Sequence, residues 1–174
     1  MPSLFQIKSF LRHWLLRVDE HSIHSPFFFD LYEKVIRNKQ GIPDFRDIEA
    51  VRQKLLASTT EIEVVDLGAP SHYFTGSKRP LSQVAATSAS PVNHARLLYR
   101  LATYLQATLL VELGTSVGMT TLYLSRVPNA RVITFEGNPQ LIDVAKTHVE
   151  LFQATNIQIV EGQLDETLHR FLQQ

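Results

Sequence analysis

The sequence has no cysteine, no excess charge of either sign and no long apolar run, and each absence excludes a class of protein. Without cysteine there is no disulfide framework, thiol nucleophile or thiolate metal site. The 17 basic and 17 acidic side chains balance, so no global field favours nucleic acid or a membrane. No apolar stretch is long enough to span a bilayer. We therefore expect a cytoplasmic protein with no nucleic-acid partner and no membrane span.

The composition is typical of a folded globular protein. Its 174 residues are 44% hydrophobic and 20% charged, which allows a substantial buried core. The first residues do not form a signal peptide, because Lys8, Arg12 and Arg17 interrupt the apolar side chains. The same residues have the spacing of an amphipathic helix. We expect this helix to pack against the body of the protein or a second subunit rather than to lie on a membrane.

Two regions differ in the structure that they predict. Residues 1–90 indicate a helical leader and lid region, with helices beginning near Pro26 and Asp44, a short strand, and then a loop or lid rich in Ser, Thr, Pro and Gly. Residues 91–174 predict a helix and then alternating strands and helices, as in a parallel sheet. The expected strands are 61–67, 108–113, 131–136 and 157–160; the expected loop or lid is 68–90, and the helices of the second region are 119–126, 139–153 and 164–172.

The segment LLVELGTSVG, residues 109–118, is the most informative. It is a buried-strand pattern that ends in Glu112 and opens onto Gly114 and Gly118, four residues apart. The glycines allow the main chain to turn sharply and approach a ligand, and the following helix offers unpaired N–H groups. A carboxylate repels phosphate but accepts hydrogen bonds from an ammonium or a hydroxyl. The segment therefore predicts a site for a zwitterionic ligand without phosphate.

The next two strands also end in polar or flexible residues. Glu136 lies 18 residues beyond Gly118, where a carboxylate can accept hydrogen bonds from two vicinal ribose hydroxyls. The third strand leads to Gly162, which allows close passage by a flat ring, and to Gln163 and Asp165, either of which could form a hydrogen bond to an adenine edge. A nicotinamide site is disfavoured, because its fingerprint needs glycines two and then three residues apart.

These residues resemble the class I S-adenosylmethionine (SAM) dependent methyltransferases. Their first motif, ExGxxxG, is matched by Glu112, Gly114 and Gly118. The stretch LLYRLATYLQ followed by VELGTSVGMTTLYLS looks like the small-molecule O-methyltransferase branch, and DEHSIHSPFFFDLYEKV resembles the leader of a bacterial subgroup of such enzymes. The resemblance implies SAM as cofactor, a small-molecule substrate and methyl transfer to oxygen.

The resemblance also assigns roles to individual residues. It implies that Glu112 and the turn from Gly114 to Gly118 hold the methionine part of the cofactor, with Thr115 and Ser116 near its carboxylate. Glu136 would hold the ribose. The expected cofactor-binding residues are Glu112, Gly114, Thr115, Ser116, Gly118, Glu136, Gly162 and Gln163.

The chain departs from this family at its end. The family has a seven-stranded sheet, whereas the sequence stops after the third strand and its helix, so we expect N-terminal helices and an incomplete, truncated Rossmann-like domain over residues 91–174. The family's catalytic residues and metal ligands follow later strands, so no catalytic residue is assigned and no metal is expected. The edge of strand 108–113 would be open. We expect the 61–67 strand, the leader or a second copy, in a homodimer, to cover it.

Two other functions remain open. GTSVG is also a GxSxG string, so Ser116 could be the nucleophile of a serine hydrolase. Such an enzyme needs an acid and then a histidine on later strands, and only His148 and His169, both within predicted helices, follow Ser116. The second alternative is a catalytically inactive module that binds a nucleoside or, through its helical leader, a protein.

Overall fold

The computed structural model describes residues 4–16, 24–37, 40–64 and 78–173, and its contacts divide the chain into two units. The first unit is Met1–Gln40 and the second is Gly41–Gln174. The domain boundary near residue 90 stays a prediction; by contacts alone the chain divides at residue 40. None of the described helices is long and apolar enough to cross a membrane.

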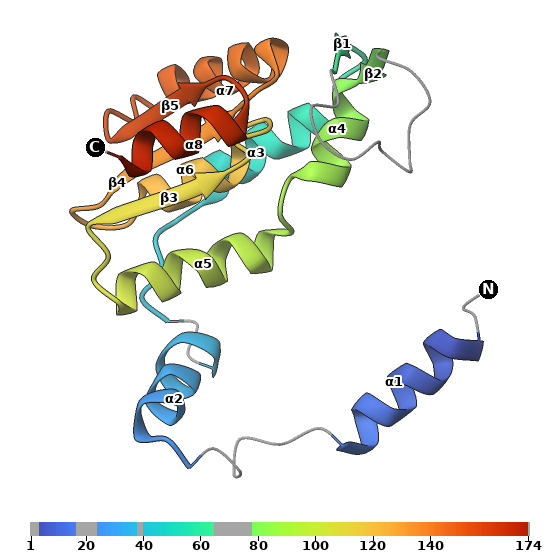
Figure 1. Cartoon of the computed structure of the whole chain (residues 1–174), viewed down its shortest axis with the longest axis vertical. Coiled ribbons are helices and arrows are strands. Elements are labelled where there is room, and N and C mark those ends of the chain that lie inside the picture. Colours follow the sequence, from blue (N-terminus) through green and yellow to red (C-terminus); the bar gives the residue numbers. More distant parts are fainter. Residues whose placement is uncertain (1–3, 17–23, 38–39, 65–77, 174) are drawn as a thin grey trace. The chain divides into compact units, whose positions relative to one another are not determined.

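The first unit is helical, as the sequence predicts (Figure 1). Ser25 caps the second helix by accepting a hydrogen bond from the backbone N–H of Phe28 at 3.5 Å, and Pro26 occupies the first helical position. No residue of the first two helices is buried, whereas Val35 is. The elements are α1 (Leu4–Leu16), α2 (Pro26–Leu31) and the π-helix η2 (Tyr32–Arg37).

The second unit is built on a parallel sheet of three strands in the order β3-β4-β5. The register pairs Val111 with Ile133, and Thr134 with Ile159. This confirms the predicted fold class, and the observed bounds of these elements lie within two residues of the expected ones. They are β3 (Leu109–Leu113), α6 (Met119–Ser125), β4 (Arg131–Glu136), α7 (Pro139–Leu151), β5 (Ile157–Glu161) and α8 (Leu164–Leu172).

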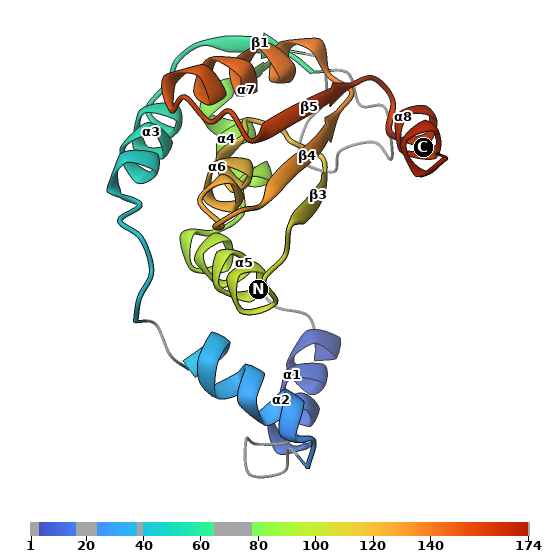
Figure 2. The ribbon, with the colours of Figure 1, turned by 90° about the vertical axis from the view of Figure 1, so that its left-hand side faces the viewer.

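The two faces of this sheet are covered unequally. Figure 2 shows α6 and α7 on one face and α8 alone on the other. Phe135 of β4 meets Phe171 of α8 edge to face, with ring centroids 5.7 Å apart. By the alternation of side chains along strands and by the register, Leu109, Val111 and Leu113 lie on the same face as Phe135. They are 50%, 45% and 54% exposed, so α8 leaves the β3 side of this face open.

The remaining elements of the second unit are α3 (Arg46–Leu56), β1 (Glu61–Glu63), β2 (Lys78–Pro80), α4 (Leu81–Ser88) and α5 (Val92–Tyr104). The prediction of a loop over 68–90 is wrong for residues 78–88, which form β2 and α4. Leu81, Val84 and Ala85 of α4 are buried, at a helical spacing that the surrounding Ser and Thr residues concealed. Residues 65–77, which include the rest of the expected loop and the end of the expected 61–67 strand, lie outside the described residues.

The buried face of α5 consists of small side chains and one tyrosine. The buried residues of this helix are Ala95, Tyr99 and Ala102. Leu98 is 41% exposed. The small alanine side chains favour close approach of two helices, and α5 contacts α6. Tyr99 packs against Phe45, with ring centroids 5.3 Å apart.

The outer edge of β3 has no partner strand among the described residues. Strand β3 pairs with β4, whereas β1 pairs antiparallel with β2, joining Ile62 to Arg79. The expectation that the 61–67 strand covers this edge is therefore wrong for its described part. Coverage by a second copy stays a prediction.

Candidate functional site

The turn after β3 has an unusual backbone conformation. Gly114, Ser116 and Gly118 have φ angles of 91°, 50° and 76°, in the left-handed region that glycine adopts most easily. The N–H groups of Gly114 and Thr115 both donate to the carbonyl of Phe135 at 3.0 Å, which ties the turn to β4. Ser116 adopts the left-handed conformation without being glycine. Such strain is common at functional sites, because surrounding contacts must maintain it.

Glu112 is partly buried beneath this turn. Its Oε2 accepts hydrogen bonds from Thr121 Oγ1 at 2.5 Å and Thr134 Oγ1 at 2.7 Å. Thr134 Oγ1 is also 2.6 Å from Thr115 Oγ1. Burial raises the pKa of Glu112, while the two threonine hydroxyls oppose that rise. The carboxyl group is thus oriented by α6 and β4 through one oxygen, and Oε1 has no hydrogen bond from a described residue.

A cavity of about 300 Å³ lies at the carboxyl end of β3. Its walls come from the β3 turn, the first residues of α6, the segment between α4 and α5, and Leu98 of α5. This volume is at the lower end of those of ligand pockets, so it suits one part of a cofactor-sized molecule. The residues that line the cavity are Ser88, Ala89, Ser90, Leu98, Glu112, Leu113, Gly114, Thr115, Ser116, Val117, Met119 and Thr120.

The structure brings half of the expected cofactor residues into this cavity. Glu112, Gly114, Thr115 and Ser116 line it, and Gly118, Glu136, Gly162 and Gln163 do not. Gly118 instead packs against α7: a Cβ atom at this position would lie 3.4 Å from Ala145. The role expected for each of the eight residues stays a prediction.

Glu136, at the end of β4, is hydrogen-bonded to the turn that follows β3. Its Oε2 accepts a hydrogen bond from the N–H of Ser116 at 2.8 Å, and Oε1 accepts from Gly137 at 3.0 Å and Asn138 at 2.9 Å. A carboxylate has about four lone-pair positions, so these bonds fill three of them. The geometry leaves Glu136 one position for a ligand hydroxyl, rather than the two that vicinal ribose hydroxyls would fill.

Gly162 and Gln163 lie beside Glu136 at the same edge of the sheet. The Gly162 N–H donates to the carbonyl of Glu136 at 2.9 Å, and the φ angle of Gly162 is 123°. The carbonyl of Gln163 accepts hydrogen bonds from the backbone N–H and the hydroxyl of Thr167, at 3.0 and 2.8 Å. The Gln163 residue is exposed, which leaves its side-chain amide open to a ligand.

Ser88 is a candidate site residue that the sequence did not indicate. Its Oγ lies 2.6 Å from Ser116 Oγ and 2.7 Å from the carbonyl of Val84. Because a hydroxyl has one proton and a carbonyl can only accept, Ser88 donates to Val84, and Ser116 donates to Ser88. Ser88 and Ser116 are 28 residues apart in sequence. A Ser-rich segment gives no local signal for this pairing.

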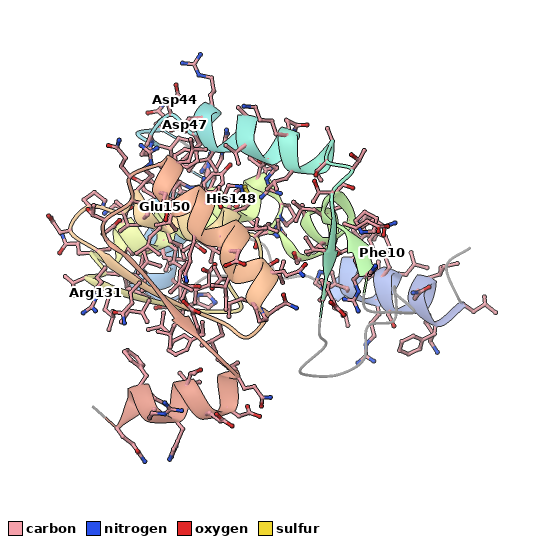
Figure 3. The ribbon with its side chains drawn as sticks, turned by 90° about the horizontal axis from the view of Figure 1, so that it is seen from above. Phe10, Asp44, Asp47, Arg131, His148 and Glu150 are labelled. Atoms are coloured by element: carbon pink, nitrogen blue, oxygen red, sulfur yellow. The ribbon has the colours of Figure 1, made fainter. Side chains whose placement is uncertain are left out.

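Arg52 of α3 holds the segment that follows Ser88. One of its terminal nitrogens, Nη2, donates to the carbonyl of Ser90 at 2.5 Å, and the residue is only 8% exposed. Near the start of α3, which Figure 3 marks by Asp44 and Asp47, Asp47 pairs with Arg126, the residue after α6, at 2.6 Å. Helix α3 therefore holds the Ser90 wall of the cavity and also contacts the end of α6.

A second network joins α3 to α5 and α6. Arg96 of α5 donates to Glu49 of α3, and the hydroxyl of Tyr123 donates to the same carboxylate oxygen at 3.3 Å. Burial, and then the neighbouring Glu49 carboxylate, raise the pKa of Tyr123 to about 12. Tyr123 is therefore a neutral donor at physiological pH, and it serves packing rather than proton transfer.

The surroundings of Ser116 disfavour a serine hydrolase. Its hydroxyl is bonded to Ser88, and neither His148 nor His169 is hydrogen-bonded to it. His148, on α7 in Figure 3, is buried, and its Nδ1 lies 2.8 Å from the carbonyl of Val117. Burial lowers the pKa of His148. The imidazole thus fastens α7 to the turn and does not face the hydroxyl as a base.

Within the described part of the chain, no group of three or more His, Cys, Asp or Glu side chains is placed to hold a metal ion. The expectation of a metal-free site is not tested by this observation.

No protein-family model and no curated protein matches the sequence. Solved structures do match the fold. The O-methyltransferase from Bacillus cereus in complex with SAH superposes with a TM-score of 0.55 and 19% identity, over 82% of this chain and 55% of that one. The SAH-bound Podospora anserina methyltransferase PaMTH1 gives a TM-score of 0.53 and 14% identity, over 83% of this chain and 53% of that one.

The chain therefore has the Rossmann-like α/β fold of class I SAM-dependent O-methyltransferases. It spans about half the length of the solved structures that it matches. At this level of identity the likeness defines the fold, and the activity must be argued from the site.

Proposed function

We propose that the chain binds S-adenosylmethionine at the cavity beside β3 and that it serves methyl transfer to an oxygen of a small molecule. The observation that carries the proposal is Glu112. It is a partly buried carboxylate at the carboxyl end of β3 that lines a cavity, and it has one oxygen without a hydrogen bond from a described residue. Both solved structures named above are SAH complexes with this fold.

The cavity suits the methionine end of that cofactor. Its ammonium group would donate to Glu112, and its carboxylate would accept hydrogen bonds from hydroxyls that line the same cavity. Ser90 and Thr120 line the cavity and supply such hydroxyls, whereas Ser116 and Ser88 already donate their protons to Ser88 and to the Val84 carbonyl. A carboxylate together with hydroxyl donors in one small cavity matches a zwitterion better than a phosphate, which Glu112 would repel.

The rest of the cofactor would follow the strand ends. We place the ribose at Glu136, through the acceptor position that its three backbone hydrogen bonds leave, and the adenine beside Gly162 and Gln163. The Gly162 N–H bonded to the Glu136 carbonyl keeps these two positions adjacent. Carboxyl ends of parallel strands are the usual ligand-binding edge of such sheets.

Bound SAM would supply an electrophilic methyl carbon on a sulfonium. The residues of this chain bind and orient that group, and orientation accounts for much of the rate in a direct displacement. Transfer of that methyl group to the oxygen of an acceptor hydroxyl would break the sulfur–carbon bond, leave the neutral thioether SAH and release the hydroxyl proton to solvent. Absence of cysteine and balanced charge favour a cytoplasmic location.

We also propose that a second copy covers the outer edge of β3. That edge has no partner strand among the residues that the structure describes, and Leu109, Val111 and Leu113 beside it are each about half exposed. An open apolar strand edge favours pairing with another strand. Sedimentation equilibrium of the wild type tests this proposal, and a monomer at all concentrations would exclude it.

Calorimetric titration with SAH tests the cofactor site. We expect wild type to bind and Glu112→Gln to bind about 10- to 100-fold more weakly, because a hydrogen bond to a charged group contributes about 1.5–3 kcal/mol. Glu136→Ala should also weaken binding. Glu150→Gln is the matched control, since Glu150 is an exposed acid on α7 (Figure 3). Absence of binding by wild type would contradict the proposal and favour the inactive interaction module.

A further inference from the structure

Helix α1 has an apolar side that no described residue of its unit covers. At 3.6 residues per turn, six of its side chains fall within an arc of about 140° of the helix circumference. Every residue of α1 is exposed, from 87% for Leu4 to 44% for Ile7 among its large apolar residues. Phe10 is labelled on this helix in Figure 3. The arc consists of Leu4, Ile7, Phe10, Leu11, Trp14 and Leu15; Phe5 and Leu16 fall outside it.

The cations of α1 lie beside this arc on the helix circumference. Lys8 and Arg12 follow Leu15 by about 20° and about 60°, Phe5 and Leu16 lie beyond them, and the 13 residues of the helix contain no acid. The nearest acids in the sequence, Asp19 and Glu20, follow its C-terminal end. Among the described residues, neither Lys8 nor Arg12 forms a salt bridge.

The charged side chains of the other described helices of this unit, α2 and η2, are already matched. On α2 and η2, Lys34 pairs with Asp30 at 2.9 Å and Arg37 pairs with Glu33 at 2.8 Å, each one turn apart. These helices therefore offer α1 no unmatched acid. The α1 helix of a second copy would bring the same positive charges, which repel. Charge complementarity thus favours an anionic surface outside the protein.

We infer that α1 binds an anionic lipid surface, lying in the plane of the interface. Its apolar arc enters the boundary between headgroups and acyl chains, and Lys8 and Arg12 contact the anionic headgroups. Apolar residues that include Phe and Trp, together with basic residues beside them, are typical of such helices. Thirteen residues extend about 20 Å, which is too short to span the bilayer. It is an alternative to the expectation that the helix packs against protein, which stays a prediction, and it does not depend on the cofactor site.

Trp14 makes a direct test possible, because it is the only tryptophan in the chain. Its fluorescence therefore reports on α1 alone. We expect the full chain to sediment with phosphatidylcholine vesicles that contain phosphatidylglycerol, with a blue shift of Trp14 emission. Pure phosphatidylcholine vesicles should bind much less, and added salt should weaken the binding.

Two variants separate the contributions of charge and apolar surface. Lys8→Gln with Arg12→Gln should weaken binding to the anionic vesicles by about 30-fold, at about 1 kcal/mol for each cation. Ile7→Ser with Leu11→Ser should reduce the blue shift while the charges remain. The control, Lys54→Gln with Arg170→Gln, removes the same charge from exposed positions of the second unit and should bind like wild type.

Three results would overturn the inference. The first is wild-type Trp14 emission that does not change with anionic vesicles. The second is equal binding to neutral and anionic vesicles. The third is a concentration-dependent blue shift without vesicles, together with dimers in sedimentation, which would show that a second copy occupies the apolar arc.

Discussion

The two sides of β3 are built differently. On one side Glu112 lies under α6, and its Oε2 accepts hydrogen bonds from Thr121 and Thr134. On the other side Leu109, Val111 and Leu113 are about half exposed. The covered side has the arrangement of a preorganised binding site. The open side has only apolar area, which stabilises a partner but specifies no chemistry.

The largest effect is expected on the covered side, where Gly118 meets α7. Gly118→Val places a β-branched side chain at a φ of 76°, against Ala145, and should destabilise the protein by about 3 kcal/mol or more. Gly41→Val is the matched control, because Gly41 has a similar φ of 71° and nothing within 4 Å of the added Cβ. Urea unfolding measures both. Equal losses of stability in the two variants would mean that contact with Ala145 contributes nothing to the destabilisation by Gly118→Val.

A pair of valines compares the two sides directly. Val132→Ala removes methyl groups from a fully buried position and should lower the free energy of unfolding by about 2 kcal/mol. Val111→Ala, at a position 45% exposed, should lower it by less than about 1 kcal/mol. Thermal unfolding of both variants at several protein concentrations measures the two effects. A loss of stability in Val111→Ala as large as that in Val132→Ala would show that the open side is covered in solution.

The smallest effect concerns pH and Glu112. Burial raises the pKa of Glu112 above its ordinary value of 4.5. Between the unfolded and folded pKa values, the native state retains a proton that the unfolded state has lost, so stability falls as pH rises. Binding of an ammonium group needs the carboxylate. Affinity for SAH should therefore increase with pH through the same window, about tenfold for each unit by which the pKa is raised.

Calorimetry with SAH at a series of pH values tests that dependence. Glu112→Gln removes the titrating proton, so its weaker affinity should stay constant over the same range. An affinity of wild type that is constant, or that falls as pH rises above 4.5, would separate the ligand's ammonium group from Glu112.

Local sequence signals predicted most of the sheet region. Asn138 accepts hydrogen bonds from the N–H groups of Gln140 and Leu141, as expected for the residue before Pro139. Gly114 adopts the positive φ that its place in the turn suggested. These features depend on neighbouring residues, so a single sequence contains their cause.

Local sequence signals did not predict features that depend on packing between segments far apart in the sequence. Helix α4 was concealed by its Ser and Thr content, and α5 buries its alanines rather than its leucines because α6 approaches closely. Neither the contact of Ser88 with Ser116 nor the hold of Arg52 on Ser90 has a periodic signature. Both depend on how α3 and α4 fold back toward β3.

The sequence by itself determined that three successive strands end in Glu112, Glu136 and Gly162, because strand alternation and turn residues are local properties. The tertiary structure decided how those ends are used. It partly buried Glu112 and filled three of the four acceptor positions of Glu136 with backbone N–H groups. It also brought Ser88 to the cavity. These outcomes depend on distances of a few ångströms between segments far apart in sequence, which only the packed fold defines.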